Sequence, residues 1–588
     1  NNDTLKANSS GAEESNYQVD ALSNGFQIKN TWNEFNENGA TILYLAIGDD
    51  EIGSDEDCLV DVPNAVTADA DATDTTGGYQ RGNYATLNPL ENPDGFTLSN
   101  GNLETTINTN TGNSASSTIH MTTGRWYWEN TITWNGNDGG GTGIIRGSDS
   151  NAAYNSSNSG VHIGATIYWV DGTLTTGQTP SWATQSVPHV IGHALDLDNG
   201  NIKFYLNGVL WKTITLPSST TGWKAHSNYG SAGGSMTCKY NFGQMRFKYP
   251  MPSGYAALNT TALPAATIAD GSAQFDTKLW TGNATDNRDI TGYEFSPDLV
   301  WIKERGSGGD HHLFDILRGA TKAMRSNEKD AEVTATDELK AFNSDGFRLG
   351  TGGDVNASST ATVGWAWDAG SSTVSNTDGS ITTSLRANPT AGFSIATYTG
   401  SGSSGSTLGH GLNAEPEFVI VKARTKSDDW RVYHKGVGTG HYLRLNGNHA
   451  KTSGGNWQSV SSTTLALDSD SAVNSSSHTY VAYFFAPVAG YSAFGKYDGS
   501  SSLPFVYTGF KPIFILIKRF DSGSSNDWYI FDTARNTYNA VNSGLFPSLS
   551  SSETTQTSYD IDFVSNGFKF RNTNNGLNAS GGEYIYWA

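Results

Sequence analysis

The chain has 588 residues, too many for a single hydrophobic core, so we expect several domains of about 100 to 200 residues each. Gly, Ser, Thr, Asn and aromatic residues are abundant and helix formers are sparse, which favours short strands joined by turns. The 57 acidic residues outnumber the 36 basic ones and give a net charge of -21, which argues against nucleic acid and anionic membranes as partners.

The N-terminal segment, residues 1–48, repeats the C-terminal end of the chain. Residues 17–31 align without a gap to residues 559–573, and both copies contain the sequence Asn-Gly-Phe, which predicts a hairpin turn. Only the back half of a repeat module is present here, and half a sandwich cannot bury its own core. We therefore expect the missing strands to come from a longer polypeptide or from a neighbouring subunit.

Residues 49–78 are acidic and rich in small side chains, beginning with Asp49, Asp50 and Glu51. Such a composition predicts a linker or an extended arm. The negative charge of the chain could hold divalent cations, but solubility of a concentrated assembly is the simpler interpretation.

Residues 79–263 form a module of a different kind. Its characteristic segments are 124–129, which reads Gly-Arg-Trp-Tyr-Trp-Glu, 190–208, and the tail from 241 to 255. Within the second segment, two alternating strands flank Asp-Asn-Gly at 198–200, which predicts a hairpin whose turn needs a positive φ. These segments resemble the SPRY domain. The resemblance implies a lectin-like sandwich of two sheets that recognises ligands through its loops and has no catalytic role.

Tryptophans near loops are the candidate ligand contacts of this module. Trp134, Trp169 and Trp182 lie close to Gly-, Asp- or Thr-rich loops, where an exposed ring can stack on a sugar or a peptide. Packing in the core or at its rim is the alternative interpretation. Trp126 and Trp128 alternate with Tyr127 along a predicted strand, so we expect at least one face of these rings in the core.

Three complete repeats follow, at residues 264–390, 391–488 and 489–588. Each contains a proline followed by a short apolar run that ends in lysine, at 297–303, 416–422 and 512–518. The proline marks a strand start or edge, and the apolar run predicts a buried central strand. The fold class is therefore all-β: tandem β-sandwich modules, comprising one SPRY-like sandwich, three complete repeats and one N-terminal half-repeat.

The order of modules is also similar to that of large tail-associated proteins of marine-type bacteriophages. The segments that carry this resemblance are 82–89, which opens the SPRY-like module, and 295–303, near the start of the first repeat. The resemblance implies a structural and adhesive virion protein in a tail or fibre, located outside cells, that binds a host-surface glycan or protein. Other virion proteins are the expected partners, and we expect a homo-oligomer, with a trimer as the first guess.

Two other functions remain open. The chain could be a secreted bacterial adhesin or the subunit of an extracellular filament in which the half-module of one chain is completed by the next. A polysaccharide depolymerase ranks behind both. Its candidate carboxylates are the pairs Asp310 with Asp315 and Asp527 with Asp532, but the middle repeat has His434 at the second position, which favours a structural hydrogen-bonding role.

Metal and cofactor chemistry finds little support in the sequence. His311, His312, His434 and His441 lack a third ligand at a convincing spacing, so we expect surface or turn histidines. Residues 196–200 are superficially similar to a calcium loop but lack its terminal glutamate, and a turn is the better interpretation. The two cysteines, Cys58 and Cys238, indicate neither a zinc site nor a disulfide scaffold. We expect no enzyme activity and no cofactor. We also expect no membrane insertion, since no apolar run of about 18 residues occurs.

Overall fold

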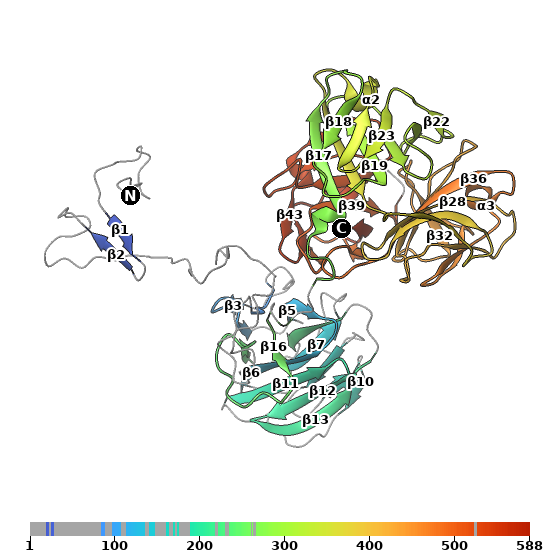
Figure 1. Ribbon diagram of the computed structural model, residues 1–588. Coiled ribbons are helices and arrows are strands. Elements are labelled where there is room, and N and C mark those ends of the chain that lie inside the picture. Colours follow the sequence, from blue (N-terminus) through green and yellow to red (C-terminus); the bar gives the residue numbers. More distant parts are fainter. Residues whose placement is uncertain are drawn as a thin grey trace. The chain divides into compact units, whose positions relative to one another are not determined.

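The computed structural model describes most of the chain (Figure 1). The described residues are 19–22, 25–28, 84–88, 97–107, 113–135, 140–146, 160–163, 168–170, 173–175, 188–217, 222–229, 235–259, 262, 266–501, 503–522 and 526–588. The chain divides into two compact units, Asn1–Val62 and Pro63–Ala588. No helix among the described residues is long and apolar enough to cross a membrane.

In the first unit, the described residues form a hairpin of β1 (Val19–Leu22) and β2 (Gly25–Ile28). Its register, with Val19 opposite Ile28, equals that of β43 (Ile561–Val564) and β44 (Gly567–Phe570), where Ile561 is opposite Phe570. The predicted hairpin at Asn-Gly-Phe is thus confirmed in both copies. The expected linker at 49–78 lies outside the described residues.

The SPRY-like module, defined here as residues 79–263, contains two sheets whose strands pair antiparallel except for β16, which is parallel to β6. The first sheet has the order β10-β9-β8-β7-β14-β5 and the second β13-β12-β11-β6-β15-β4-β3, with β16 paired to β6. The strands are β3 (Thr97–Ser99), β4 (Glu104–Ile107), β5 (Asn113–Met121), β6 (Arg125–Asn135), β7 (Gly140–Arg146), β8 (Gly160–Ile163), β9 (Tyr168–Val170), β10 (Thr173–Thr175), β11 (His189–Asp196), β12 (Asn201–Leu206), β13 (Val209–Thr215), β14 (Trp223–Tyr229), β15 (Ser235–Asn241) and β16 (Ala256–Ala257). One apolar cluster, including Trp128, Ile144 and Phe204, draws residues from both sheets.

The turn between β11 and β12 is the predicted one. Gly200 has a φ of 64°, the left-handed region that glycine enters without a steric penalty. The Asp196 carboxylate accepts a hydrogen bond from the Asn199 backbone N–H at 3.0 Å. The carboxylate therefore closes its own turn, as expected for residues that join two paired strands.

The three repeats together are called the three-module body, residues 264–588. The first contains η4 (Gly271–Ala273), β17 (Phe275–Thr281), β18 (Arg288–Thr291), β19 (Leu299–Glu304), β20 (His311–Asp315), β21 (Lys322–Arg325), β22 (Val333–Thr334), β23 (Leu339–Asn343), β24 (Gly346–Leu349), α2 (Gly353–Asn356) and β25 (Ala361–Trp367). Its larger sheet has the order β17-β25-β19-β20-β21-β22, and its smaller sheet the order β18-β24-β23.

The second module extends this plan by one hairpin. Its strands and helix are β26 (Thr373–Asn376), β27 (Thr383–Asn388), β28 (Phe393–Thr399), β29 (Ser406–Gly409), β30 (Phe418–Ala423), β31 (Arg431–His434), β32 (His441–Arg444), β33 (Thr452–Ser453), β34 (Trp457–Val460), β35 (Thr464–Leu467), α3 (Ser471–Asn474) and β36 (Thr479–Phe485). The sheets are β26-β27-β28-β36-β30-β31-β32-β33 and β29-β35-β34. The added hairpin β26–β27 precedes residue 391 in the chain but pairs with β28 of this module.

The third module has a shorter version of the same two sheets. Its elements are β37 (Phe494–Asp498), β38 (Phe505–Tyr507), β39 (Phe514–Arg519), β40 (Trp528–Asp532), β41 (Ser543–Gly544), β42 (Thr554–Thr555), η5 (Thr557–Tyr559), β43, β44, α4 (Asn575–Asn578) and β45 (Glu583–Trp587). The sheets have the orders β37-β45-β39-β40 and β38-β44-β43. The all-β architecture of paired sheets is therefore present in every repeat.

The apolar runs that end in lysine are buried on both faces of their sheets. Along β19, Leu299 and Trp301 enter a core shared by all three modules, whereas Val300 and Ile302 enter the core of the first module alone. The same alternation holds in β30 and β39. A strand covered on both faces needs apolar residues at every position, which explains the continuous runs in the sequence. The prediction of buried strands is confirmed.

The equivalent residues Asp315, His434 and Asp532 each contact the last strand of another module around this shared core. The three contacts are Tyr483 Oη donating to Asp315 (2.7 Å), His434 Nε2 facing the Tyr586 carbonyl oxygen (3.2 Å), and Trp365 Nε1 donating to Asp532 (3.0 Å). They run from the first module to the second, from the second to the third, and from the third back to the first. The body is therefore a closed pseudo-threefold ring within one chain.

A second set of contacts repeats the same cycle nearer to the surface. It consists of the ion pairs Arg424–Glu332 (2.9 Å) and Arg305–Glu553 (2.7 Å) and of the Lys451 amine over the Phe520 ring (4.9 Å). Lys451 also lies 3.6 Å from the Glu583 carboxylate of the third module. Each of the three junctions therefore has an ion pair, and the one at Lys451 adds a cation–π contact.

Candidate functional site

The predicted ligand-binding tryptophans cannot be placed as side chains. Trp134 lies in β6 and Trp169 in β9, but their side chains are outside the described part of the structure, and Trp182 lies outside the described residues altogether. Their stacking on a ligand stays a prediction. Trp126 and Trp128 are buried in the core of the module, as expected.

A polar cleft lies where the three characteristic segments of the SPRY-like module, 124–129, 190–208 and 241–255, meet. Its volume is 470 Å³, and its lining residues are Thr123, Gly124, Arg125, Trp126, Asp198, Gly254, Ala256 and Ala262. The segment 124–129 is tied to the 196–200 turn because the Gly124 N–H donates to the Asp198 carboxylate at 3.1 Å. The cleft is therefore built by the residues that carry the family resemblance.

Two exposed charges face this cleft. The Arg125 guanidinium lies 3.4 Å from the Asp196 carboxylate and 3.5 Å from that of Asp198. The side chains of Arg125 and Asp198 are 39% and 52% exposed, so both can reach a ligand. Hydrogen bonds from Asn199 and the charge of Arg125 lower the pKa of Asp196 although burial acts the other way. The cleft thus presents a cation beside ionised carboxylates, an arrangement suited to polar recognition.

Buried histidines lie between the two sheets. His162 Nε2 is 2.7 Å from His226 Nδ1, and His193 Nε2 is 3.1 Å from the Thr142 hydroxyl. Burial lowers the pKa of His162 to about 4 and that of His193 to about 3, so these rings are neutral near pH 7. Sequence reasoning missed this cluster because its members come from different strands and form no local motif.

The carboxylates considered for sugar hydrolysis are all held by internal partners. Asp315 accepts bonds from Arg318 and Tyr483, and Asp532 accepts bonds from Arg535 and Trp365. The first acid of each pair is hydrogen-bonded as well. Asp310 accepts a hydrogen bond from Asn327 at 2.7 Å, and Asp527 accepts one from Ser548 at 3.1 Å. Asp315 and Asp532 are also buried. In each pair the second acid is therefore buried and the first is half-exposed, and all four carboxylates accept hydrogen bonds from the protein.

In the middle module, both members of the buried aspartate–arginine pair are replaced by uncharged residues. His434 occupies the position of Asp315, as its pairing opposite Phe418 shows, and Val437 follows at the spacing of Arg318. Burial lowers the pKa of His434 to about 4, so a neutral ring replaces a buried ion pair. Removing only one member of such a pair would leave an uncompensated charge in the core.

The predicted surface histidines are mostly interior. His311 and His312 are buried in β20 and His434 is buried in β31, so the prediction of surface or turn positions is wrong for these three residues. His441 opens β32 and is half-buried. The cause is the double coverage of the sheet: even polar positions of β20 are enclosed, by the smaller sheet or by the next module.

His312, Glu338 and Asp354 lie close enough to be considered as metal ligands. The Nδ1 atom of His312 is 2.8 Å from Glu338 and its Nε2 atom is 3.2 Å from Asp354. A single ion cannot bind both nitrogens of one imidazole, so the set fits a protonated ring held between two carboxylates better than a metal. Consistent with this, the carboxylates raise the pKa of His312 even though burial lowers it.

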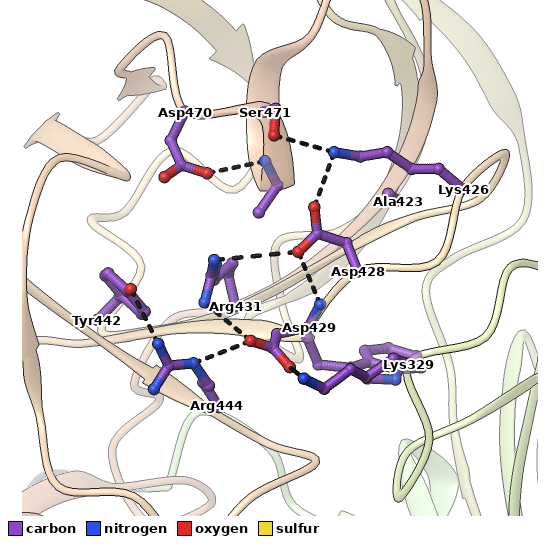
Figure 2. Close-up of polar contacts among 12 residues, drawn as sticks. Lys329, Ala423, Lys426, Asp428, Asp429, Arg431, Tyr442, Arg444, Asp470 and Ser471 are labelled. Carbon is purple, nitrogen blue, oxygen red and sulfur yellow. Dashed lines mark hydrogen bonds and ion pairs between the residues drawn. The ribbon is translucent and has the colours of Figure 1, made fainter.

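The second module carries a larger charge network at the equivalent place (Figure 2). Arg431 takes the position of His312 and lies 3.5 Å from Asp429, which also binds Arg444 at 2.9 Å. Lys329 of the first module completes the network, 3.2 Å from Asp429. The network therefore joins two modules, and its charges are satisfied internally.

Three equivalent lysines are fully buried, although a lysine is expected at the surface. Lys303, Lys422 and Lys518 end the apolar runs, and each donates to backbone carbonyl oxygens, such as that of Asn526 at 2.8 Å from Lys518 Nζ. Burial lowers their pKa values to about 8, 8 and 7 respectively. The repeated lysine, visible in the sequence, is thus a buried donor that closes the end of its strand.

Comparison with known proteins finds one matching family and a group of solved structures. Residues 270–588 match the model of a domain of unknown function, DUF7483. No curated protein sequence matches the chain.

Solved structures similar to the chain include SPRY domains. The SPRY domain of human HERC1 is 15% identical over 28% of this chain and 98% of its own, with a TM-score of 0.23. The TRIM65 PSpry domain is 14% identical over 27% of this chain and 93% of its own, with a TM-score of 0.21. The stonustoxin structure is 18% identical over 27% of each chain, with a TM-score of 0.22. Because these scores are low, the SPRY-like assignment continues to rest on the sequence segments and on the two-sheet topology.

Proposed function

The chain belongs to the DUF7483 family, and from this premise we propose that it is a structural and adhesive protein of a virion tail or fibre. In this proposal the three-module body is a rigid support, and the SPRY-like module binds a glycan or protein on the host surface. The protein acts outside cells, as a homo-oligomer in contact with other virion proteins.

The contrast between the two regions supports this division of labour. In the body, the four acids considered for catalysis and the side chains of His311, His312 and His434 are bonded to internal partners, which suits a support. In the SPRY-like module, the cleft presents Arg125 and Asp198 to solvent. This exposed charged cleft is the observation that carries the proposal. Trp134 and Trp169, which belong to strands of the same module, are the proposed stacking partners for a sugar.

A second candidate function has its own support. The β1–β2 hairpin has the register of the β43–β44 hairpin of the third module, although it lies in the other compact unit of the chain. A repeat hairpin that pairs with strands of a neighbouring chain is the arrangement of a filament subunit or adhesin assembled by strand addition. A depolymerase is the weakest candidate because its carboxylates are engaged inside the body.

Two measurements test the proposal. Immunogold electron microscopy of particles with an antibody against the chain should label a tail or fibre. Labelling of the bacterial surface instead would favour the adhesin. On a glycan array, the full chain should bind, and Trp169→Ala should lose binding while Trp280→Phe, a change in the body, keeps it. Absence of binding both to glycans and to host cells would reject the adhesive role.

A further inference from the structure

An aromatic cavity lies on the pseudo-threefold axis of the body, at the end where the equivalent strands β17, β28 and β37 begin. Its volume is 300 Å³. Each module contributes the first residue of one of these strands and the aromatic residue paired with it: Phe275 with Trp367, Phe393 with Phe485, and Phe494 with Trp587. All six rings are at least nine-tenths shielded from solvent. They also contact one another, for example Phe485 and Trp587 with ring centres 4.4 Å apart.

The walls of the cavity leave few polar groups for a ligand. Ser272 donates its hydroxyl hydrogen to Asp270 at 2.6 Å, and the Ser492 hydroxyl accepts the Val488 N–H at 3.0 Å. Both of these hydroxyls are thus engaged in the protein, and the remaining hydroxyl of the lining belongs to the half-buried Tyr491. A ligand in this space gains mainly from burying apolar surface against the rings.

One charge stands at the mouth. Lys511 is exposed and is the single charged residue among those that line the cavity, beside Ile513, whose side chain is 47% exposed. Among the described residues, the Lys511 amine has no ion pair within 4.0 Å. An apolar ligand that ends in an anionic group would therefore place that group beside an uncompensated cation.

We propose that the axial cavity binds a small apolar molecule with one terminal carboxylate, of the class of medium-chain fatty acids. Its chain would lie among the six rings and its carboxylate beside Lys511. The volume has room for roughly ten groups of the size of water, since each water occupies about 30 Å³ in the liquid. This role is independent of host attachment by the SPRY-like module.

Titration of the full chain with decanoate and with decan-1-ol tests the proposal. Trp367 and Trp587 line the cavity, so their fluorescence should change in a saturable way with either probe. Decanoate should bind more tightly than the alcohol. Lys511→Glu should weaken decanoate binding about fivefold to tenfold, because an attraction becomes a repulsion, and should leave decan-1-ol binding unchanged. The matched control is Lys496→Glu, which reverses an exposed lysine of β37 outside the cavity lining.

Three results would overturn the proposal. The first is the absence of saturable binding of decanoate, which would also be expected if the cavity receives a side chain of another protein. The second is an equal loss of affinity in Lys511→Glu and Lys496→Glu, which would indicate general charge attraction. The third is decanoate binding that Lys511→Glu leaves unchanged. Because Lys511 is exposed, the folded state should survive its substitution, and a thermal unfolding curve checks this.

Discussion

The SPRY-like module and the three-module body both bury neutral histidines, but the body buries more charged groups. In the SPRY-like module, burial lowers the pKa values of His162 and His193. The body has buried histidines of this kind too, such as His434. It also encloses three lysines bonded to carbonyl oxygens and two arginines paired with Asp315 and Asp532. The two regions should therefore respond differently to pH and to substitution, although both are β-sandwiches.

The largest expected effect is the loss of the SPRY-like module in acid. The folded pKa values of His162 and His193 lie below the ordinary histidine value of 6.5, so the unfolded chain takes up protons first as the pH falls. Stability is full above about pH 6.5 and falls towards about pH 4, by about 3 kcal/mol for each histidine. Hydrogen exchange at neutral and acidic pH should show opening of β8 and β11 before the strands of the body. Earlier opening of the body would contradict this prediction.

The next largest effect is expected from truncating a buried tryptophan in the core of each region. Trp301→Ala removes a ring from the core shared by all three modules and should cost about 3 to 5 kcal/mol. Because that core is shared, the three modules should lose stability together in thermal unfolding. Trp128→Ala, the matched change in the SPRY-like module, should destabilise that module and leave the transition of the body in place. Independent unfolding of the repeats in Trp301→Ala would show that the ring is not one cooperative unit.

The role of the buried ion pairs can be tested by placing the residues of one module at the equivalent positions of another. Asp315→Ala leaves Arg318 buried without its carboxylate and should destabilise the body by about 3 to 5 kcal/mol. The double variant Asp315→His with Arg318→Val copies the second module and should recover much of that loss. Denaturant unfolding measures both. A double variant no better than Asp315→Ala would show that His434 depends on features peculiar to its own module.

The buried lysines predict a smaller, alkaline response of the body. Their folded pKa values, about 8, 8 and 7, lie below the ordinary lysine value of 10.5, so the unfolded state binds protons more tightly between these limits. Stability should therefore rise with pH across this window. Lys422→Met should reduce that rise by about 1 kcal/mol per pH unit, whereas Lys496→Met should not. Identical slopes for the wild type and Lys422→Met would mean that the buried amine titrates normally.

Local patterns in the sequence were enough for strands and turns. The Asp-Asn-Gly turn, the Asn-Gly-Phe hairpins and the apolar runs all depend on neighbours in the chain, and the structure confirms them. The ring of modules could not be derived in this way. Its contacts, such as Tyr483 with Asp315, join residues 168 positions apart and include different chemistry in each copy.

The candidate sites were predictable to different degrees. The family segments located the SPRY-like module, but not the meeting of Arg125 with Asp196 and Asp198, which depends on the pairing of β6 with β11. Burial of His312 was missed because a two-sided sheet hides polar positions that a one-sided sheet would expose. The lysine at the end of each run was recognised as a repeat, while its burial became evident only from the packing of the modules.

The most direct test of the account compares binding by the two regions in the full-length chain. Arg125→Glu reverses the exposed charge of the SPRY-like cleft, and Arg348→Glu reverses an arginine of similar exposure, 42%, in the body. Binding of labelled chain to host cells should fall about tenfold or more in Arg125→Glu and stay unchanged in Arg348→Glu. Loss of binding in Arg348→Glu with full binding in Arg125→Glu would place recognition in the body and contradict the account.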